Sequence, residues 1–209
     1  MERGSPMTTG QIYLVRHGET DWSKSGRHTG RTEIPLTQQG ENDARAVASL
    51  LPLHPDLVLC SPLQRAQRTA ALAGLAVTRM EPDLLEWDYG AWEGLTTAEI
   101  RKQLNEPDWT VWAEPIPAGT TPGEQLTDIH ARTARVIEQC LPVVSSGGTC
   151  VLVAHGHVLR ILTATWLGLE PIAGRLLALD PATLSILGFE HEQQVIRTWN
   201  SRASQLARL

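Results

Sequence analysis

The sequence predicts an α/β fold, a three-layer α/β/α sandwich around a mainly parallel, doubly wound sheet. Strand-like apolar runs alternate with helix-like segments along the 209 residues, which is typical of a parallel sheet covered by helices on both faces. In addition, no internal repeat, low-complexity tract or linker divides the chain, whose length suits one domain. We therefore expect a flexible N-terminal tail at residues 1–10 and a single domain over residues 11–209.

The strands are predicted from short apolar runs bounded by polar residues. Residues 11–15 (QIYLV), 56–60 (DLVLC) and 149–154 (TCVLVA) are typical of strands buried on both faces. Residues 76–78 form a weaker run of the same kind. Residues 183–190 and 193–199 alternate between apolar and polar side chains, so we expect two closing strands in a hairpin.

The helices are predicted from apolar residues spaced three and four apart. Apolar residues with this spacing follow Thr37, whose side chain suits an N-cap, so we expect a helix to begin near Thr37. Ser61 and Pro62 predict an N-cap followed by proline at the first helical position, opening a helix over residues 61–72. Further helices are expected at residues 97–104, 126–141 and 158–167, the last ended by Gly168, whereas the polar residues 18–36 predict a long loop.

Composition excludes several classes of function. The net charge of −5 argues against a nucleic-acid binder that works through bulk charge. No apolar run approaches the roughly 18 residues of a membrane-spanning helix, and residues 1–7 lack an apolar signal segment, so we expect a cytoplasmic protein. Three cysteines without a CxxC pair predict no disulfide framework, and Cys60 and Cys150 lie in apolar runs as small core residues.

Three of the predicted strands are followed by polar residues that can bind anions. Arg16 and His17 follow the first strand, Ser61 to Arg65 follow the second, and His155 to His157 follow the run at 149–154. Ligands of open α/β sheets bind outside the carboxyl ends of the strands, so these segments should converge. Arginines, histidines and helix N-termini at one place form an anion pocket, most simply one for phosphate.

The residues at 14–20 (LVRHGET) resemble the signature of the histidine phosphatase superfamily, the phosphoglycerate mutase-like proteins. The resemblance extends from Ile12 to about Trp199. Supporting segments occur in the same order along the chain, at residues 29–30, 34–40, 61–70, 86–94 and 154–157. This resemblance implies the phosphoglycerate mutase-like form of the α/β/α fold.

The resemblance also implies a mechanism. His17 is the expected nucleophile, forming a phosphohistidine, and the cations Arg16, Arg65 and His155 favour its neutral form. The same three residues are expected to hold the phosphate oxygens, each arginine through two parallel hydrogen bonds. Glu86 is the expected general acid and then general base, with Leu84, Leu85 and Trp87 desolvating its carboxyl. No metal and no other cofactor is expected, because the arginines supply the electrostatic stabilisation.

Further residues are implied to surround the phosphate or the substrate. Ser23 occupies a position where the family often has an asparagine that touches phosphate. His28 and His157 are expected near the pocket as lining residues rather than catalytic ones. The remaining implied contacts with phosphate or substrate are Gly18, Thr29, Gly30, Tyr89 and Gly156.

The family contains both mutases and phosphatases. A mutase must retain a second anionic group on the substrate, and family mutases carry a basic insertion for this purpose. Here residues 105–123 contain no Lys or Arg, and Thr97 stands where a lysine is expected. We therefore expect a phosphomonoester hydrolase for small phosphorylated metabolites, such as sugar phosphates. The alternative functions are a phosphoglycerate mutase and a non-catalytic phosphate-binding module. Family members often form homodimers, so the sequence leaves a homodimer open.

Overall fold

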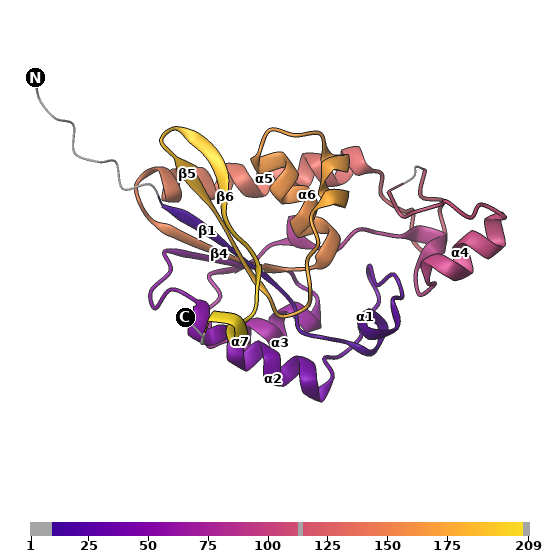
Figure 1. Cartoon of the computed structure of the whole chain (residues 1–209), viewed down its shortest axis with the longest axis horizontal. Helices are drawn as coiled ribbons and strands as arrows, with labels where there is room; N and C mark the ends of the chain where they lie inside the picture. The colour runs from indigo at the N-terminus through magenta and orange to yellow at the C-terminus, as the bar shows by residue number, and fades with distance from the viewer. Residues whose placement is uncertain (1–9, 113–114, 207–209) are drawn as a thin grey trace, which may run out of the picture.

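The structure is a computed structural model that describes residues 10–112 and 115–206, and a six-stranded sheet lies at its centre (Figure 1). Apart from Gly10, the expected tail lies outside the described residues. The spatial order of the strands is β3-β2-β4-β1-β5-β6. Their bounds are β1 Gln11–Arg16, β2 Leu57–Cys60, β3 Arg79–Met80, β4 Thr149–Ala154, β5 Leu184–Glu190 and β6 Gln193–Ser201.

The predicted mainly parallel sheet is confirmed. β1 pairs with β4, β4 with β2, and β2 with β3, all in parallel, while the hairpin of β5 and β6 adds an antiparallel edge. The strand expected at 76–78 is misplaced, because β3 begins at Arg79. The Thr78 amide donates to the Val58 carbonyl at 2.9 Å, but the Val58 amide donates to the Thr78 hydroxyl at 3.0 Å, and regular parallel pairing begins only at Arg79.

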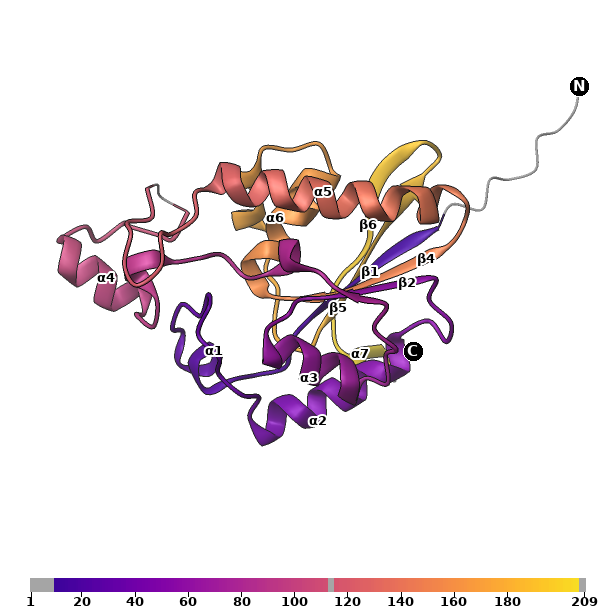
Figure 2. The same ribbon diagram turned by 180° about the vertical axis from the view of Figure 1, so that it is seen from behind.

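Helices cover both faces of the sheet, as expected. α5 and α6 lie on one face, and α2, α3 and α7 lie on the other (Figures 1 and 2). The short helices α1 and α4 lie together to one side of the sheet. The bounds are α1 Asp21–Ser25, α2 Gln38–Val47, α3 Gln64–Leu72, α4 Thr97–Leu104, α5 Leu126–Ser145, α6 Gly156–Trp166 and α7 Ala203–Leu206. No helix in these ranges is long and apolar enough to cross a membrane.

Two apolar clusters pack against the two faces of the sheet. Alternate residues of β4 contribute to each: Cys150 and Leu152 to the cluster beneath α5 and α6, Val151 and Val153 to the one beneath α2 and α3. This double burial explains the continuous apolar run in the sequence. Cys60 and Cys150 are free and buried, which confirms their expected role as core residues.

The predicted helix start is confirmed at Thr37 but is wrong for α3 and α6. Thr37 caps α2 as expected, accepting the Gly40 amide at 3.0 Å. The expected cap at Ser61 is wrong: α3 begins at Gln64, and the Ser61 hydroxyl bonds to the His155 ring at 2.7 Å. α6 begins two residues earlier than predicted, with His155 as its N-cap. The loop expected at 18–36 contains α1, which is too short to show an apolar face.

Two glycines allow α2 to lie directly against the segment that follows β1. A Cβ at Gly40 would lie 2.2 Å from the Glu19 carbonyl oxygen, and a Cβ at Gly18 would lie 2.4 Å from the Gly40 carbonyl oxygen. Both contacts are with backbone, which cannot turn aside as a flexible side chain could. The glycine pair therefore sets how closely the helix approaches the residues beside His17.

We expect Gly40→Ala to destabilise the protein by about 1–3 kcal/mol, the usual cost of overpacking. Helix propensity alone would predict the opposite sign, a gain of about 0.5–1 kcal/mol on replacing a helical glycine by alanine. Urea unfolding measures the difference. Asn42→Ala, on the exposed face of the same helix, should change stability by less than about 0.5 kcal/mol. An unchanged or higher stability of Gly40→Ala would show that the backbone contact is not limiting.

Candidate active site

The polar segments that follow β1, β2 and β4 converge, as the sequence predicts. The parallel ladder continues one residue beyond the strands: the His17 amide donates to the Ala154 carbonyl and the Ser61 amide to the Val153 carbonyl, both at 2.9 Å. The imidazole rings of His17 and His155 consequently lie 5.1 Å apart between centroids.

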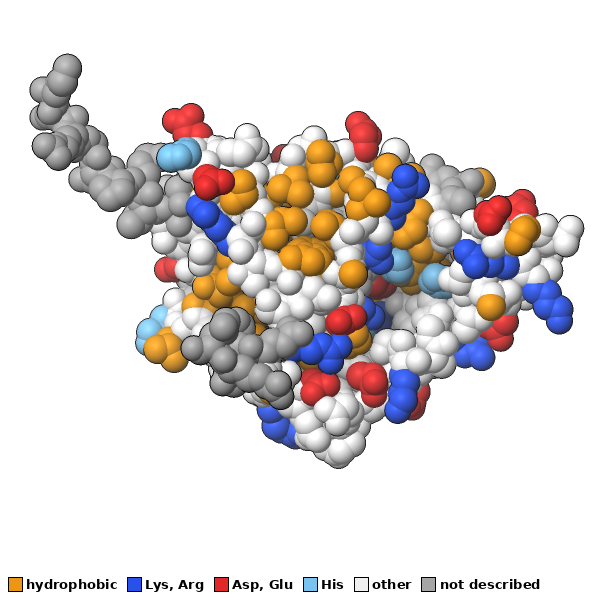
Figure 3. Space-filling model, in the orientation of Figure 1, with side chains coloured by type: hydrophobic (Ala, Val, Ile, Leu, Met, Phe, Trp, Pro, Cys, Tyr) orange, Lys and Arg blue, Asp and Glu red, His pale blue; other side chains and the backbone are white. Residues whose placement is uncertain are grey.

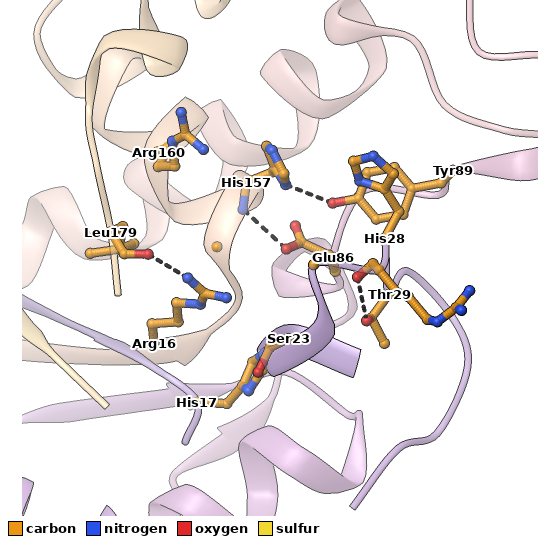
Figure 4. A pocket seen from close by; sticks show the side chains of 13 residues that line it. Arg16, His17, Ser23, His28, Thr29, Glu86, Tyr89, His157, Arg160 and Leu179 are labelled. Carbon is orange, nitrogen blue, oxygen red and sulfur yellow. Dashed lines mark hydrogen bonds between the residues drawn. The ribbon is translucent and has the colours of Figure 1, made fainter. Parts of the chain in front are cut away.

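A pocket of about 190 Å³ opens at this place. Figure 3 shows the hollow, with histidine side chains in its wall. In Figure 4, Arg16 and His17 lie on one side, Tyr89, His28 and Thr29 on the other, and Glu86 between them. The complete lining is Arg16, His17, Ser23, Gly26, Arg27, His28, Thr29, Glu86, Tyr89, Gly156, His157, Arg160 and Leu179.

His17 is buried, and its surroundings favour the neutral imidazole. Its Nδ1 lies 2.7 Å from the Gly18 carbonyl oxygen, which can only accept, so Nδ1 carries the hydrogen and Nε2 keeps its lone pair. Burial holds the pKa of His17 well below its ordinary value, and the charges of Arg65 and Arg16 lower this pKa further. The two arginines thus oppose protonation of His17, as the sequence predicts.

Arg16 presents an unpaired donor in the pocket. Its Nη1 donates to the Leu179 carbonyl, but its buried Nε has no hydrogen-bond partner among the described residues. A Cβ at Gly156 would lie 3.3 Å from the Arg16 guanidinium carbon, so the glycine allows the arginine to lie close to the start of α6. A buried donor without an acceptor is costly, and an anionic oxygen in the pocket would satisfy it.

Arg65 does not line the pocket, in contrast to the expected two-bond contact with phosphate. Its side chain is buried, and Nη1 donates to the Thr32 carbonyl at 2.9 Å. Nη2 donates to the Thr29 and Gly30 carbonyls at 3.1 and 2.9 Å. Backbone carbonyls therefore accept from three of the four terminal N–H groups, and the positive charge of Arg65 acts on His17.

His155 is neutral, so it is not the cation that the resemblance implies. Its Nδ1 accepts from Arg65 Nε at 3.1 Å, so Nε2 carries the hydrogen and donates to Ser61 Oγ at 2.7 Å. Burial lowers the pKa of His155 well below its ordinary value, and the charge of Arg65 lowers it further. His155 lies behind His17 rather than in the pocket lining.

Glu86 is held against the first turn of α6. Its Oε1 accepts the Trp87 and Val158 amides, each at 2.9 Å, and its Oε2 accepts the His157 amide at 3.0 Å. The side chain is buried, as expected. The three amide donors that fix the position of this carboxyl are a feature that sequence reasoning missed.

The other implied contact residues divide into those that line the pocket and those that support it. Tyr89 lines the pocket, and its hydroxyl lies 2.7 Å from Nδ1 of His157. Ser23 and Thr29 also line it, although the Ser23 hydroxyl already caps α1 through Thr20 and the Thr29 hydroxyl donates to a backbone carbonyl. Gly18 and Gly30 are outside the lining.

The two extra histidines lie in the pocket wall, as expected. Burial lowers the pKa of His28 to about 4. Burial and the Arg160 charge lower the pKa of His157 well below its ordinary value. Both rings are thus neutral near pH 7 and contribute hydrogen-bonding and apolar surface rather than charge.

Sequence reasoning missed three charged residues that lie in the pocket or behind it. Arg160 lies four residues after Gly156 on α6, so helical spacing could have placed it beside the pocket. Arg132 and Glu124 lie behind Glu86 as a buried ion pair, and no local pattern marks them. In the ranges that the structure describes, no group of three or more His, Cys, Asp or Glu side chains is placed to hold a metal ion.

Comparison with known proteins identifies the family to which this chain belongs. An acid phosphatase of Mycobacterium tuberculosis is 41% identical over 184 residues, which is 87% of each chain. A sedoheptulose 1,7-bisphosphatase of Saccharomyces cerevisiae is 35% identical over 194 residues, covering 78% of this chain and 70% of the relative. The structure of a functionally characterised open reading frame of M. tuberculosis superimposes with a TM-score of 0.85 at 38% identity, covering 93% of this chain and 98% of that one.

Mutases are also among the relatives, for example a probable phosphoglycerate mutase of Photorhabdus laumondii with 34% identity over 202 residues. The family defined as the histidine phosphatase superfamily (branch 1) matches residues 12–202. This match includes β1, β2 and β4, the segments that follow them, and Glu86. The chain therefore belongs to the histidine phosphatase superfamily, branch 1.

Proposed function

We propose that this protein hydrolyses phosphomonoesters of small metabolites through a phosphohistidine at His17. One observation carries the proposal: a neutral imidazole with a free Nε2 lies in the same pocket as a buried, unpartnered guanidinium donor of Arg16. A nucleophile beside an anion-binding donor is the arrangement that phosphoryl transfer needs. The phosphatase relatives support the same reaction.

In the first step, Nε2 of His17 attacks phosphorus, the bond to the ester oxygen breaks, and Glu86 donates a proton to the departing alkoxide. The Gly18 carbonyl, bonded to Nδ1–H, stabilises the positive charge that the ring gains. In the second step Glu86 takes a proton from water, water attacks phosphorus, and the bond to Nε2 breaks.

The substrate we propose is a sugar phosphate with a second anionic group. Relatives named for sedoheptulose bisphosphate and for glucosyl-3-phosphoglycerate support this class. In the pocket, Arg160 is held by the Gly174 and Arg175 carbonyls at 3.0 and 3.1 Å and stacks on Trp112, 4.8 Å from the ring centroid. Among the described residues no carboxylate pairs with it at ion-pair distance, so its charge is available to a ligand.

The mutase alternative needs the same second anion to be held while the substrate reorients. Arg160 alone supplies charge from α6, and residues 105–123 contribute no cation. We therefore propose hydrolysis as the main reaction, with water rather than a retained substrate accepting the phosphoryl group. The cytoplasmic location, the single-domain organisation and a homodimer stay predictions.

His17→Ala should abolish turnover while the far-UV circular dichroism spectrum stays that of the wild type. Acid-quenched wild-type enzyme should carry phosphate on nitrogen, labile in acid and stable in alkali. His54→Ala is the control, since His54 is exposed and outside the pocket, and it should keep full activity. Normal turnover by His17→Ala would overturn the proposed mechanism.

Glu86→Gln should slow alkyl phosphate hydrolysis by roughly 10²–10⁴-fold, the usual contribution of general acid–base catalysis. p-Nitrophenolate leaves without a proton, so phosphorylation of His17 by p-nitrophenyl phosphate should be slowed much less. Dephosphorylation still lacks its base, so stopped-flow absorbance should show a burst of p-nitrophenol followed by slow turnover. Equal slowing of the phosphorylation step with both substrates would mean that Glu86 is not the acid.

Arg160→Gln should lower kcat/KM for a sugar bisphosphate by about 10–100-fold, because a hydrogen bond to a charged group is worth about 1.5–3 kcal/mol. The loss with p-nitrophenyl phosphate, which has no second anion, should be several times smaller. Arg27→Gln is the matched control: Arg27 also borders the pocket, but its charge is paired with Glu99 at 3.3 Å. Equal losses on both substrates would exclude Arg160 as the second anion site.

A further inference from the structure

Behind Glu86, and outside the pocket, lies a two-bond ion pair between Arg132 of α5 and Glu124. Nε of Arg132 lies 2.9 Å from Oε1 of Glu124, and Nη2 lies 3.1 Å from Oε2. The Arg132 side chain is 7% exposed, whereas the arginines of the other ion pairs in the described part of the chain are 30% exposed or more. The pair is thus a feature of the interior.

Arg132 holds the backbone of the segment that carries Glu86. Its Nη1 donates to the carbonyls of Asp83 and Leu85 at 2.8 and 2.6 Å. Its Nη2 also donates to the carbonyl of Glu86 itself at 3.2 Å. One guanidinium therefore binds three carbonyls within four consecutive residues.

Glu124 holds the same segment from its other end. Its Oε2 accepts the Asp88 amide at 2.9 Å. Its backbone carbonyl accepts the Trp87 indole Nε1 at 2.8 Å, and its backbone amide donates to the Asp88 carbonyl at 2.9 Å. Residues 85–88 belong to no helix or strand, so the ion pair supplies the backbone partners that a sheet or helix would otherwise supply.

The pair also reaches the loop around Arg65. Oε2 of Glu124 lies 3.3 Å from Nη2 of Arg31, which belongs to the loop whose carbonyls bind Arg65. A buried ion pair is weak as a source of stability, because desolvation offsets its attraction. Here the pair instead positions two parts of the chain relative to each other. It connects the segment that carries Glu86 to the loop whose carbonyls bind Arg65.

From these contacts we infer that Arg132 and Glu124 are positioning residues, which hold the Glu86 carboxyl at the first turn of α6 and within reach of the departing oxygen. The inference rests on the proposed role of Glu86 as general acid. A displacement of about 1 Å in a catalytic group can cost roughly 100-fold in rate, so loosening this segment should weaken proton transfer more than attack by His17.

The test uses Arg132→Lys, which keeps the charge but cannot reproduce the planar set of five donors. The matched control is Arg135→Lys on the same helix: Arg135 pairs with the Asp83 carboxylate at 2.7 Å and is 55% exposed. Arg132→Lys should slow alkyl phosphate turnover by roughly 10–100-fold, while the p-nitrophenol burst rate changes by less than about threefold. Arg135→Lys should leave both rates near those of the wild type.

A second measurement does not depend on the chemistry of Glu86. The amides of His157 and Val158 donate to the Glu86 carboxylate, so their hydrogen exchange reports whether the carboxylate is in place. In Arg132→Lys both amides should exchange at least tenfold faster, and in Arg135→Lys they should not. Unchanged exchange, or equal kinetic losses on both substrates, overturns the positioning role. Faster exchange together with no leaving-group effect in Glu86→Gln would instead place the error in the proposed function of Glu86.

Discussion

The parallel pairing of β4 with β1 and β2 is the constraint on which the pocket depends. Its register sets Arg16 opposite Ala154, and the ladder continues through the amides of His17 and Ser61. Three polar segments must then begin at the same edge of the sheet. Because α6 starts immediately after β4, the amides of its first turn also point to this edge, where they bind Glu86.

Among the described residues, neither Arg160 in the pocket nor Arg65 behind it forms an ion pair with a carboxylate. Arg65 is satisfied by three backbone carbonyls and a neutral histidine, and Arg160 by two carbonyls and an aromatic ring. Neutral partners meet the hydrogen-bonding needs of a buried guanidinium but leave its charge to act on the ligand and on His17. Glu124, the half-buried carboxylate that pairs with the buried Arg132, lies behind the segment it holds rather than in the pocket.

Prediction from sequence succeeded where a local pattern carried the information. The strands around Leu14, Val58 and Leu152, the cap at Thr37, the helix at 97–104 and the convergence at His17 all follow from short-range periodicity and strand ends. It failed where a side chain bonds to a distant partner. Ser61 resembles a helix cap but bonds to a residue 94 positions away, and Arg65, expected at the phosphate, bonds to the loop at 29–32.

By itself, the sequence determined the α/β class, the order of most elements and the family, and it predicted His17 as the nucleophile with Glu86 as its partner. These are properties of apolar spacing and of contiguous motifs, which a chain carries before it folds. Only the tertiary structure decided which arginines line the pocket and which histidines are neutral. It also decided that Arg132 and Glu124 hold the segment that carries Glu86. Burial, backbone partners and the tautomer of each ring depend on residues brought together from far apart in the chain, and no local pattern encodes those contacts.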